Sequence, residues 1–487
     1  MHSQLPRPLE FLRDDQVHDL HQSILQVLAE VGVRIEWKPA LEVFASHGCP
    51  VDFEARLVRI PQDVLEQALR TCPNQFTLHA LNPQNDIQVT LEDIYTIAGS
   101  SALNVLDLEG ERRPASLKDL EDFTRLIDAL EMADIMHAMV VPLDIPQVGF
   151  DRILFSTILK NTTKHYYSQG QGGRSVHDQV ELASLIQGGR QAVSERPCFS
   201  FVICLNSPLV HAPERVEEMM ECARFGIPVW LEATNMMGAT APISIAGALV
   251  EHTANVLASI TLVQLLNPGH PCIFSIASGG FNMRSGAYVA SSPEAVLLHC
   301  ATAQLARFYR LPFQGCSGVD SCLPDAQAGY ERAMQAVSFG LARVNFIHLA
   351  FGMMDQLLTS SFEQAVIDDE IFKAAFRLIQ GIPVTEETMA VDQIKNVGPG
   401  GQFLDQEYTL RNYRQHQWQP RMTVRMEWTE FQRLQGGRDM RQRANYEARR
   451  ILETHHPNPL DELLAVELDR LAREKQAQAI KQFQLDG

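Results

Sequence analysis

The sequence predicts an α/β protein built around a (β/α)8 TIM barrel, with an N-terminal α-rich cap and a C-terminal helical extension. From residue 94 onward, short apolar or β-branched runs alternate with helical stretches, eight times over about 250 residues. The competing arrangement is an open, doubly wound sheet. It usually begins with a glycine-rich first turn, and no G-x-G-x-x-G motif follows a strand here. The barrel is therefore favoured.

We expect three regions along the chain. Residues 1–90 form the cap with a small hairpin, residues 91–390 form the barrel, and residues 391–487 form a motif-bearing segment with a helical tail. In the cap, helical periodicity runs through Asp15–Val31, a second helix lies between Pro61 and Pro73, and Cys49–Pro61 alternates as a hairpin would. The tail, Arg441–Gln484, is predicted to be a helix that packs on the barrel or on a second subunit.

The expected barrel strands are Tyr95–Ala98, His137–Val141, His165–Gln169, Phe199–Leu205, Pro228–Glu232, Cys272–Ala277, Phe313–Gly318 and Asn345–Leu349. The helices expected between them include Ser116–Leu130, Pro213–Phe225, Ala246–Leu266, Pro293–Tyr309 and Ala326–Leu341. Five strand ends carry polar or small residues, and the loops after the strands build the active face of such a barrel. These ends predict a small-molecule site, although Gly, Asn, Asp and Ser also simply terminate strands.

Composition excludes several classes of partner. The formal net charge is −18, so the chain repels phosphate backbones and we expect no nucleic-acid partner. The N-terminal residues lack an apolar stretch of signal-peptide length. The longest apolar helical stretch, residues 243–267, is interrupted by Glu251 and His252, which indicates a buried helix rather than a membrane span.

The cysteines indicate a reducing compartment. There are nine of them, no pair has CxxC spacing, and most lie in apolar runs, so we expect reduced packing residues in a cytoplasmic protein. No Cys/His cluster has the spacing of a structural zinc site, so we expect no metal. A zinc site would need ligands that are distant in sequence.

Several longer stretches are distinctive, and together they resemble the trimethylamine methyltransferase (MttB) family over nearly the whole chain. They are Leu159–Lys164, Met237–Ala248, Leu305–Tyr309 with Leu311 and Pro312, Asp320–Glu331, and Val397–Leu404 leading to Thr409 and Leu410. The resemblance implies a barrel with the substrate at its mouth, and a separate corrinoid protein that presents Co(I) to the methyl group. It implies no tightly bound cofactor in this chain, and we expect a homo-oligomer.

The resemblance also narrows the substrate. Some members of the family contain pyrrolysine, whereas others lack it and act on quaternary amines such as glycine betaine. This sequence has only standard residues, including in the loop Gly315–Pro324, and so resembles the second group. A quaternary ammonium leaves as a neutral tertiary amine, so the protein needs no general acid on nitrogen. It must position one N-methyl group and exclude water.

Side chains that could hold such a substrate follow from this chemistry, while the catalytic residues stay unknown. Aromatic faces attract quaternary ammonium groups, although core packing explains any single aromatic residue as well. The aromatic candidates are Trp230, Phe281, Tyr288, Phe313 and Phe351. Asp320 and Glu232 at strand ends could offset the ammonium charge or cap helices, and His348 or Arg284 could bind a substrate carboxylate.

The chain departs from the family at three positions. Members commonly carry a histidine pair where this chain has His348 followed by Leu349, and they carry histidines where it has Gln402 and Tyr408. We take Gln402 and Tyr408 as substrate-binding candidates, for a carboxylate and a cation respectively. Two alternatives stay open: a methyltransferase for a tertiary amine or another methyl donor, and a non-catalytic barrel that binds methylamines.

Overall fold

Eight parallel strands form a closed barrel in the computed structural model, which describes residues 7–457 and 459–486. Their order in the sheet is β6–β19–β18–β15–β13–β11–β10–β9, and a bridge between Ile97 and Ile135 joins the two edge strands. This confirms the predicted barrel. The strands are β6 (Tyr95–Thr96), β9 (Ile135–Met136), β10 (His165–Ser168), β11 (Phe199–Leu205), β13 (Val229–Ala233), β15 (Cys272–Ile276), β18 (Phe313–Cys316) and β19 (Phe346–His348).

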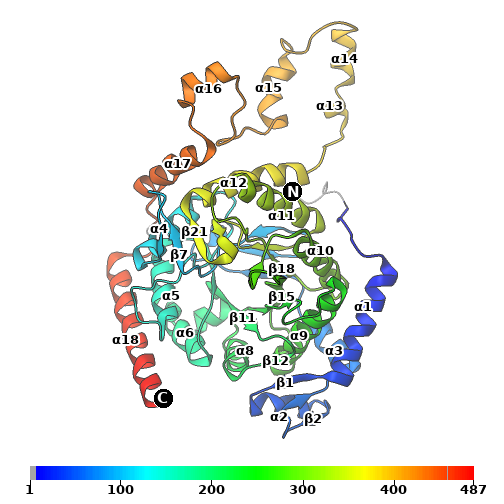
Figure 1. The fold of residues 1–487 in the computed structure, drawn as a ribbon, viewed down its shortest axis with the longest axis vertical. Helices are drawn as coiled ribbons and strands as arrows, with labels where there is room; N and C mark the ends of the chain where they lie inside the picture. The colour runs from blue at the N-terminus through cyan, green and yellow to red at the C-terminus, as the bar shows by residue number, and fades with distance from the viewer. Residues whose placement is uncertain (1–6, 458, 487) are drawn as a thin grey trace.

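A ring of helices surrounds the strands (Figure 1). Five of these helices begin at a side chain that accepts a backbone N–H of the first turn, namely Ser116, Ser244, Ser292, Asp325 and Ser361. The helices are α4 (Leu117–Ala129), α5 (Phe150–Asn161), α6 (Gly173–Gln187), α8 (Pro213–Phe225), α9 (Ile245–Leu266), α10 (Pro293–Phe308), α11 (Ala326–Ala342) and α12 (Phe362–Ile379). Short α7 (Arg190–Glu195) follows α6.

The barrel interior is a packed core near the amino ends of the strands. Side chains alternate inward and outward along each strand, and the inward-facing rings of Trp230 and Phe346 lie 4.7 Å apart between centroids. Residues from the hairpin β4 (Phe76–Leu78) and β5 (Ile87–Val89) join the same cluster. Polar side chains therefore reach the interior mainly nearer the carboxyl ends of the strands.

The N-terminal elements cover one side of the barrel. They are α1 (Asp14–Gln26), the π-helical turn η2 (Val27–Val31), β1 (Val33–Ile35), α2 (Lys38–Ser46), the hairpin β2 (Val51–Asp52) and β3 (Leu57–Val58), α3 (Gln62–Thr71) and η3 (Pro83–Asn85). Helices α1, α2 and α3 pack on α9, which explains why α9 is apolar all round. Within the described chain, α9 is the one helix long and apolar enough to cross a membrane, and it is mostly buried inside the protein.

Two small sheets extend from strand ends of the barrel. One contains β14 (Met236–Met237), β16 (Gly279–Asn282) and β17 (Ala287–Val289). The other contains β7 (Asn104–Leu106), β8 (Arg112–Pro114), β20 (Met353–Met354) and β21 (Thr359–Ser361), with the turn η4 (Asp355–Leu357) between its last two strands. Strand β12 (Val210–His211) instead pairs with β1 of the N-terminal region.

The C-terminal helices pack on the outside of the barrel at two places. Helix α17 (Met440–Thr454) packs on α12 and α4, and α18 (Glu462–Asp486) packs on α5 and α6. Between α12 and α17, the chain forms an arm, residues 380–438, which projects away from the barrel (Figure 1). The arm carries α13 (Glu386–Met389), α14 (Val391–Val397), α15 (Glu407–His416) and α16 (Trp428–Gln435).

Local details differ from the predicted elements at three places. The second strand is Ile135–Met136, not His137–Val141, because only these two residues pair with β10; the chain then leaves the ladder and bridges to Ala102 through Val140. The tail contains two helices rather than one, with Pro457 and Pro459 in the interval between them, where proline disrupts helical hydrogen bonding. Helix α2 was not predicted.

Buried histidines make the fold sensitive to acid. Burial lowers the pKa of several of them, and for five the lowered value is known: about 4 for His165, His211, His270 and His299, and about 3 for His252. The unfolded chain takes up protons on these residues as the pH falls through about 6.5, whereas the folded chain does so only near 4. The free energy of unfolding therefore decreases across this window.

Buried carboxyl groups act in the opposite direction, because burial raises the pKa of Glu218 to about 8, that of Asp134 to about 6, and those of Glu251 and Asp368. The five histidines outweigh them. We expect the urea midpoint of unfolding to fall markedly between about pH 6.5 and about pH 5, above the range where ordinary carboxylates titrate. Denaturation curves followed by circular dichroism at both pH values measure this, and an unchanged midpoint would contradict it.

Candidate functional site at the barrel mouth

Glu232 lies at the centre of a polar cluster inside the mouth of the barrel. It is the inward-facing residue two positions after Trp230 on β13, and its side chain is buried. Gln314 of β18 donates from Nε2 to Oε2 of Glu232 at 3.0 Å, and the thiol of Cys204 on β11 lies 3.6 Å from Oε1. Inward-facing residues of three barrel strands, β11, β13 and β18, thus meet at one carboxylate.

His348 and Cys316 complete the cluster. Nδ1 of His348, on β19, lies 3.8 Å from Oε2 of Glu232 and 3.6 Å from Sγ of Cys316, at the end of β18. Tyr167 of β10 donates its hydroxyl to Oε1 of Gln314 at 3.0 Å, and its ring lies 5.0 Å from that of His348. Both rings form part of the cluster's wall.

The cluster holds Glu232 in its charged form. Burial raises the pKa of this carboxyl, but the contact with the His348 ring and hydrogen bonds from Gln314 and Cys204 outweigh burial, so the pKa lies below its ordinary value. Burial, followed by the charge of Glu232, raises the pKa of the Cys204 and Cys316 thiols well above theirs. The cluster therefore holds an ionised carboxylate beside protonated thiols.

The site is open towards the mouth at Cys204. Cys204 points into the barrel interior from β11 and has protein densely around it, yet its side chain is exposed to solvent at the mouth, so a small molecule can reach the cluster there. On the His348 side, the His137 ring lies 5.3 Å away, donates from Nδ1 to the carbonyl of Tyr167 and accepts from Ser100 at Nε2. Burial, followed by the effect of the nearby His348 ring, lowers the pKa of His137 well below its ordinary value. The His137 ring is therefore uncharged and lines one side of the site.

Tyr288 is placed near the cluster by the β16–β17 hairpin. Its hydroxyl donates to the carbonyl of Ala277 at 3.1 Å, and burial, with smaller effects from Cys316, Asp320 and Glu232, raises its pKa well above the ordinary value. A Cβ on Gly279 would lie 2.7 Å from the Tyr288 ring, so only glycine permits this close approach. Phe281 pairs with Tyr288 across the hairpin and is half-buried.

Asp320 has a structural contact instead of a free carboxylate. Oδ1 accepts the backbone N–H of Ala290 at 2.9 Å, and Oδ2 accepts the Ser291 hydroxyl at 2.7 Å. The residue thus ties the loop after β18 to the segment before α10. Its oxygens are already engaged by these groups.

The structure does not bring six further sequence-predicted residues to the cluster. Leu349 has a φ of 59°, which turns the chain so that Phe351 packs on Phe372 of α12. Phe313 faces outward and packs on Phe274, Gln402 is exposed in the arm, and the Tyr408 hydroxyl contacts Nε2 of His416 within the arm at 3.1 Å. Trp230 lies one layer below Glu232, in the packed core, and Arg284 is exposed in the turn of the β16–β17 hairpin.

Sequence reasoning missed Gln314, Cys316, Cys204 and Tyr167 as members of the site. Each faces inward on the same alternation that places Glu232 and His348 inside the barrel. That alternation was readable from each strand alone. Which residues of neighbouring strands meet depends on the register of the barrel, which the sequence does not show.

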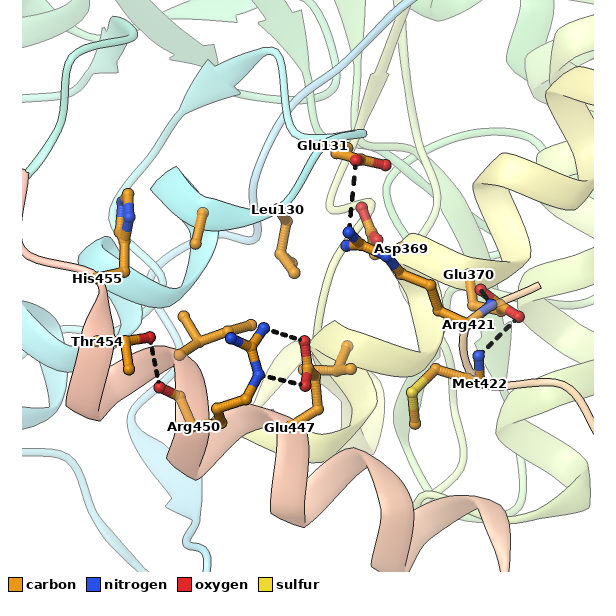
Figure 2. Close-up of a pocket in the computed structure, with 13 residues that line it drawn as sticks. Leu130, Glu131, Asp369, Glu370, Arg421, Met422, Glu447, Arg450, Thr454 and His455 are labelled. Atoms are coloured by element: carbon orange, nitrogen blue, oxygen red, sulfur yellow. Dashed lines mark hydrogen bonds and ion pairs between the residues drawn. The ribbon is translucent and has the colours of Figure 1, made fainter. Parts of the chain in front are cut away.

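A separate cavity of about 310 Å³ lies between α4, α12 and α17, and none of the cluster residues lines it (Figure 2). Its charged side chains already have partners. Arg450 binds Glu447 at 2.6 Å, and Glu370 accepts a hydrogen bond from the backbone N–H of Met422 at 3.0 Å. The cavity is therefore a gap in the packing between the C-terminal helices and the barrel helices, and the barrel mouth is the better candidate for the functional site.

Comparison with known proteins gives the family. The family model for trimethylamine methyltransferase (MTTB) matches residues 2–479. The chain belongs to this family. It is 34% identical to the glycine betaine methyltransferase of Desulfitobacterium hafniense strain Y51, over 94% of this chain and 95% of that one. It is 35% identical to the trimethylamine methyltransferase MttB of D. hafniense strain DCB-2, over 95% and 93% of the two chains.

This member of the MTTB family is a methyltransferase, and the family methylates a separate corrinoid protein. Among solved structures, the monomethylamine methyltransferase MtmB of Methanosarcina barkeri has a TM-score of 0.50, with 12% identity over 90% of this chain and 92% of that one. At this identity the likeness shows the barrel fold alone.

Proposed function

We propose that this protein transfers a methyl group from a small quaternary amine, of the glycine betaine kind, to the Co(I) of a separate corrinoid protein. The observation that carries the proposal is the buried, ionised carboxylate of Glu232 inside the mouth. A carboxylate in such surroundings attracts a cation, and a quaternary ammonium keeps its charge at every pH. The 34% identity to a glycine betaine methyltransferase agrees with this choice.

The roles of the side chains follow from the geometry. Glu232 would face the ammonium group, and Gln314 would hold the carboxylate in place through its 3.0 Å hydrogen bond. The Tyr288 and Tyr167 rings would offer faces to the cation, a contact worth about 0.5–2 kcal/mol each. No proton has to be delivered to nitrogen, because the leaving group is a neutral tertiary amine. The corrinoid supplies the nucleophile that accepts the methyl group.

Two further features belong to the proposal. We place the protein in the cytoplasm, because all nine cysteines are free. We also propose a homo-oligomer, because the arm leaves Ile382, Leu404 and Trp428 between 72% and 85% exposed, and large exposed apolar patches mark contact surfaces. A solution mass of one chain by light scattering would contradict the second statement.

Trimethylamine is the second candidate substrate, because the chain is 35% identical to a trimethylamine methyltransferase. Methylation of cob(I)alamin, followed by visible absorbance with a panel of quaternary and tertiary methylamines, separates the two. We expect methylcobalamin with quaternary amines only. Methylation by trimethylamine alone would favour the second candidate. If no amine of the panel gives methylation with a cognate corrinoid protein present, a non-catalytic binding barrel is favoured.

A further inference from the structure

Three side chains of the barrel mouth have the geometry of a metal site. One ligand atom from each of Glu232, Cys316 and His348 lies within 4.8 Å of the other two, and all three residues are buried. Sγ of Cys316 lies 4.0 Å from Oε2 of Glu232 and 3.6 Å from Nδ1 of His348, and Oε2 and Nδ1 are 3.8 Å apart. The ligands are 32 and 84 residues apart in sequence, which is why their spacing predicted no metal.

These separations match those around a tetrahedral zinc ion. Zinc binds oxygen and nitrogen ligands at about 2.0–2.2 Å and sulfur at about 2.3 Å, which puts neighbouring ligand atoms roughly 3.3–3.8 Å apart. The three separations in the mouth lie within a few tenths of an ångström of this range. Carboxylate, thiolate and imidazole together also suit zinc better than magnesium or calcium, which prefer oxygen alone.

The imidazole presents the correct nitrogen to the centre of the cluster. The Gln314 amide nitrogen, a donor, lies 3.2 Å from Nδ1 of His348, so Nδ1 acts as the acceptor and carries the lone pair. Among the described residues, Nε2 of His348 has no hydrogen-bond partner. Cys204 lies beside Glu232 on the exposed side of the cluster. Three protein ligands with an open fourth position are the pattern of catalytic zinc sites.

A second group of possible ligands shows what a cluster without a free site looks like. His177, Asp178 and Glu181 lie close together on α6. Arg152 and Arg174 bind Asp178 at 2.9 and 3.1 Å, and Lys475 and Arg190 bind Glu181. Cations of the protein itself therefore occupy these carboxylates, whereas the basic group nearest Glu232 is the His348 ring, which can itself act as a ligand.

We propose that Glu232, Cys316 and His348 bind one Zn²⁺ ion through Oε2, Sγ and Nδ1, with the fourth position open beside Cys204. The thiol proton of Cys316 passes to solvent on binding, and the carboxylate and thiolate then balance the charge of the ion. If the proposed function holds, Zn²⁺ and the quaternary ammonium both need Glu232, so each excludes the other. The metal site itself does not depend on that function.

Metal titration of the full-length, chelator-treated protein tests the site directly. We expect one Zn²⁺ per chain by calorimetry, and with Co²⁺ we expect a sulfur-to-cobalt charge-transfer band together with the visible bands of a four-coordinate ion. Cys316→Ser should abolish the charge-transfer band and weaken Zn²⁺ binding by more than about 100-fold, since loss of a ligand exceeds the ~10–100-fold cost of losing an outer-shell partner. Glu232→Gln and His348→Gln should weaken Zn²⁺ binding similarly.

Two cysteine variants serve as matched controls. Cys322→Ser removes an exposed thiol near Asp355 and should change neither the affinity nor the spectrum, and Cys204→Ser should keep the charge-transfer band. Circular dichroism checks that every variant is folded. Absence of stoichiometric binding, or an unchanged cobalt spectrum in folded Cys316→Ser, would overturn the metal site. If glycine betaine leaves the Zn²⁺ affinity of a confirmed site unchanged, the placement of the ammonium group at Glu232 fails while the metal site stands.

Discussion

Replacing Arg332 with methionine is expected to lower the free energy of unfolding by about 3–5 kcal/mol, the cost of leaving one partner of a buried ion pair uncompensated. Arg332 of α11 binds Asp368 of α12 at 3.0 Å, and both side chains are fully buried. Burial raises the pKa of Asp368, and Arg332 offsets part of that rise. Without the guanidinium, the carboxylate must remain charged in an apolar interface or take up a proton.

Chemical denaturation followed by circular dichroism measures this loss. The double variant Arg332→Met with Asp368→Leu should recover much of the stability, because it removes both charges together. Arg470→Met is the matched control: Arg470 pairs with Glu467 on the exposed face of α18 and its loss should leave the midpoint unchanged. A midpoint for Arg332→Met equal to that of the native protein would show that Asp368 is solvated or neutral in the fold.

The same pair supports the barrel mouth. Arg332 also donates from Nη1 to the Ser317 hydroxyl at 2.8 Å, and Asp368 accepts the backbone N–H of Gly352 at 2.8 Å. Ser317 directly follows Cys316, and Gly352 lies in the loop after β19. The ion pair therefore fixes the two loops that follow the strands carrying Cys316 and His348, so its loss should also lower methyl-transfer activity in molecules that remain folded.

The barrel was predictable because its signal is local. Each strand is a short apolar run and each helix has its own period and cap, so alternation along the chain was sufficient. Glu232 and His348 were likewise found from their positions at strand ends. Their neighbours Gln314 and Cys316 were not, because the contacts join strands that are distant in sequence and only the register of the closed barrel decides which side chains meet.

Residues outside the strands were harder to place for a different reason. Phe351 follows β19 by only three residues, yet the positive φ of Leu349 directs the chain outward, and nothing in the apolar sequence around it reveals that turn. Gln402 and Tyr408 lie in short helices and turns whose position depends on where the chain leaves α12. Motif similarity identified these residues, but motif similarity does not give their distance from the barrel.

Glu232→Gln is expected to lower kcat/KM for a quaternary amine by about 100- to 1,000-fold, if Glu232 faces the ammonium group as we propose. Two unit charges 4–5 Å apart interact by about 3–4 kcal/mol at an effective dielectric constant near 20. Glutamine has nearly the same shape as glutamate and can still accept the Gln314 hydrogen bond, so the change removes the charge and little else. The cob(I)alamin assay gives the rate, and calorimetry gives the affinity for the amine.

A substrate analogue without the positive charge shows whether the loss comes from charge. In 3,3-dimethylbutanoate a carbon atom replaces the nitrogen of glycine betaine, so the molecule keeps its shape and its carboxylate but has no positive charge. If Glu232 attracts the ammonium group, the variant should bind glycine betaine far more weakly than the native protein does. Its affinity for 3,3-dimethylbutanoate should stay the same or rise, since a buried negative charge near the anionic ligand has been removed. Equal losses for both ligands would instead mean that the substitution had altered the shape of the mouth, and Glu232 would then be a structural residue of the cluster.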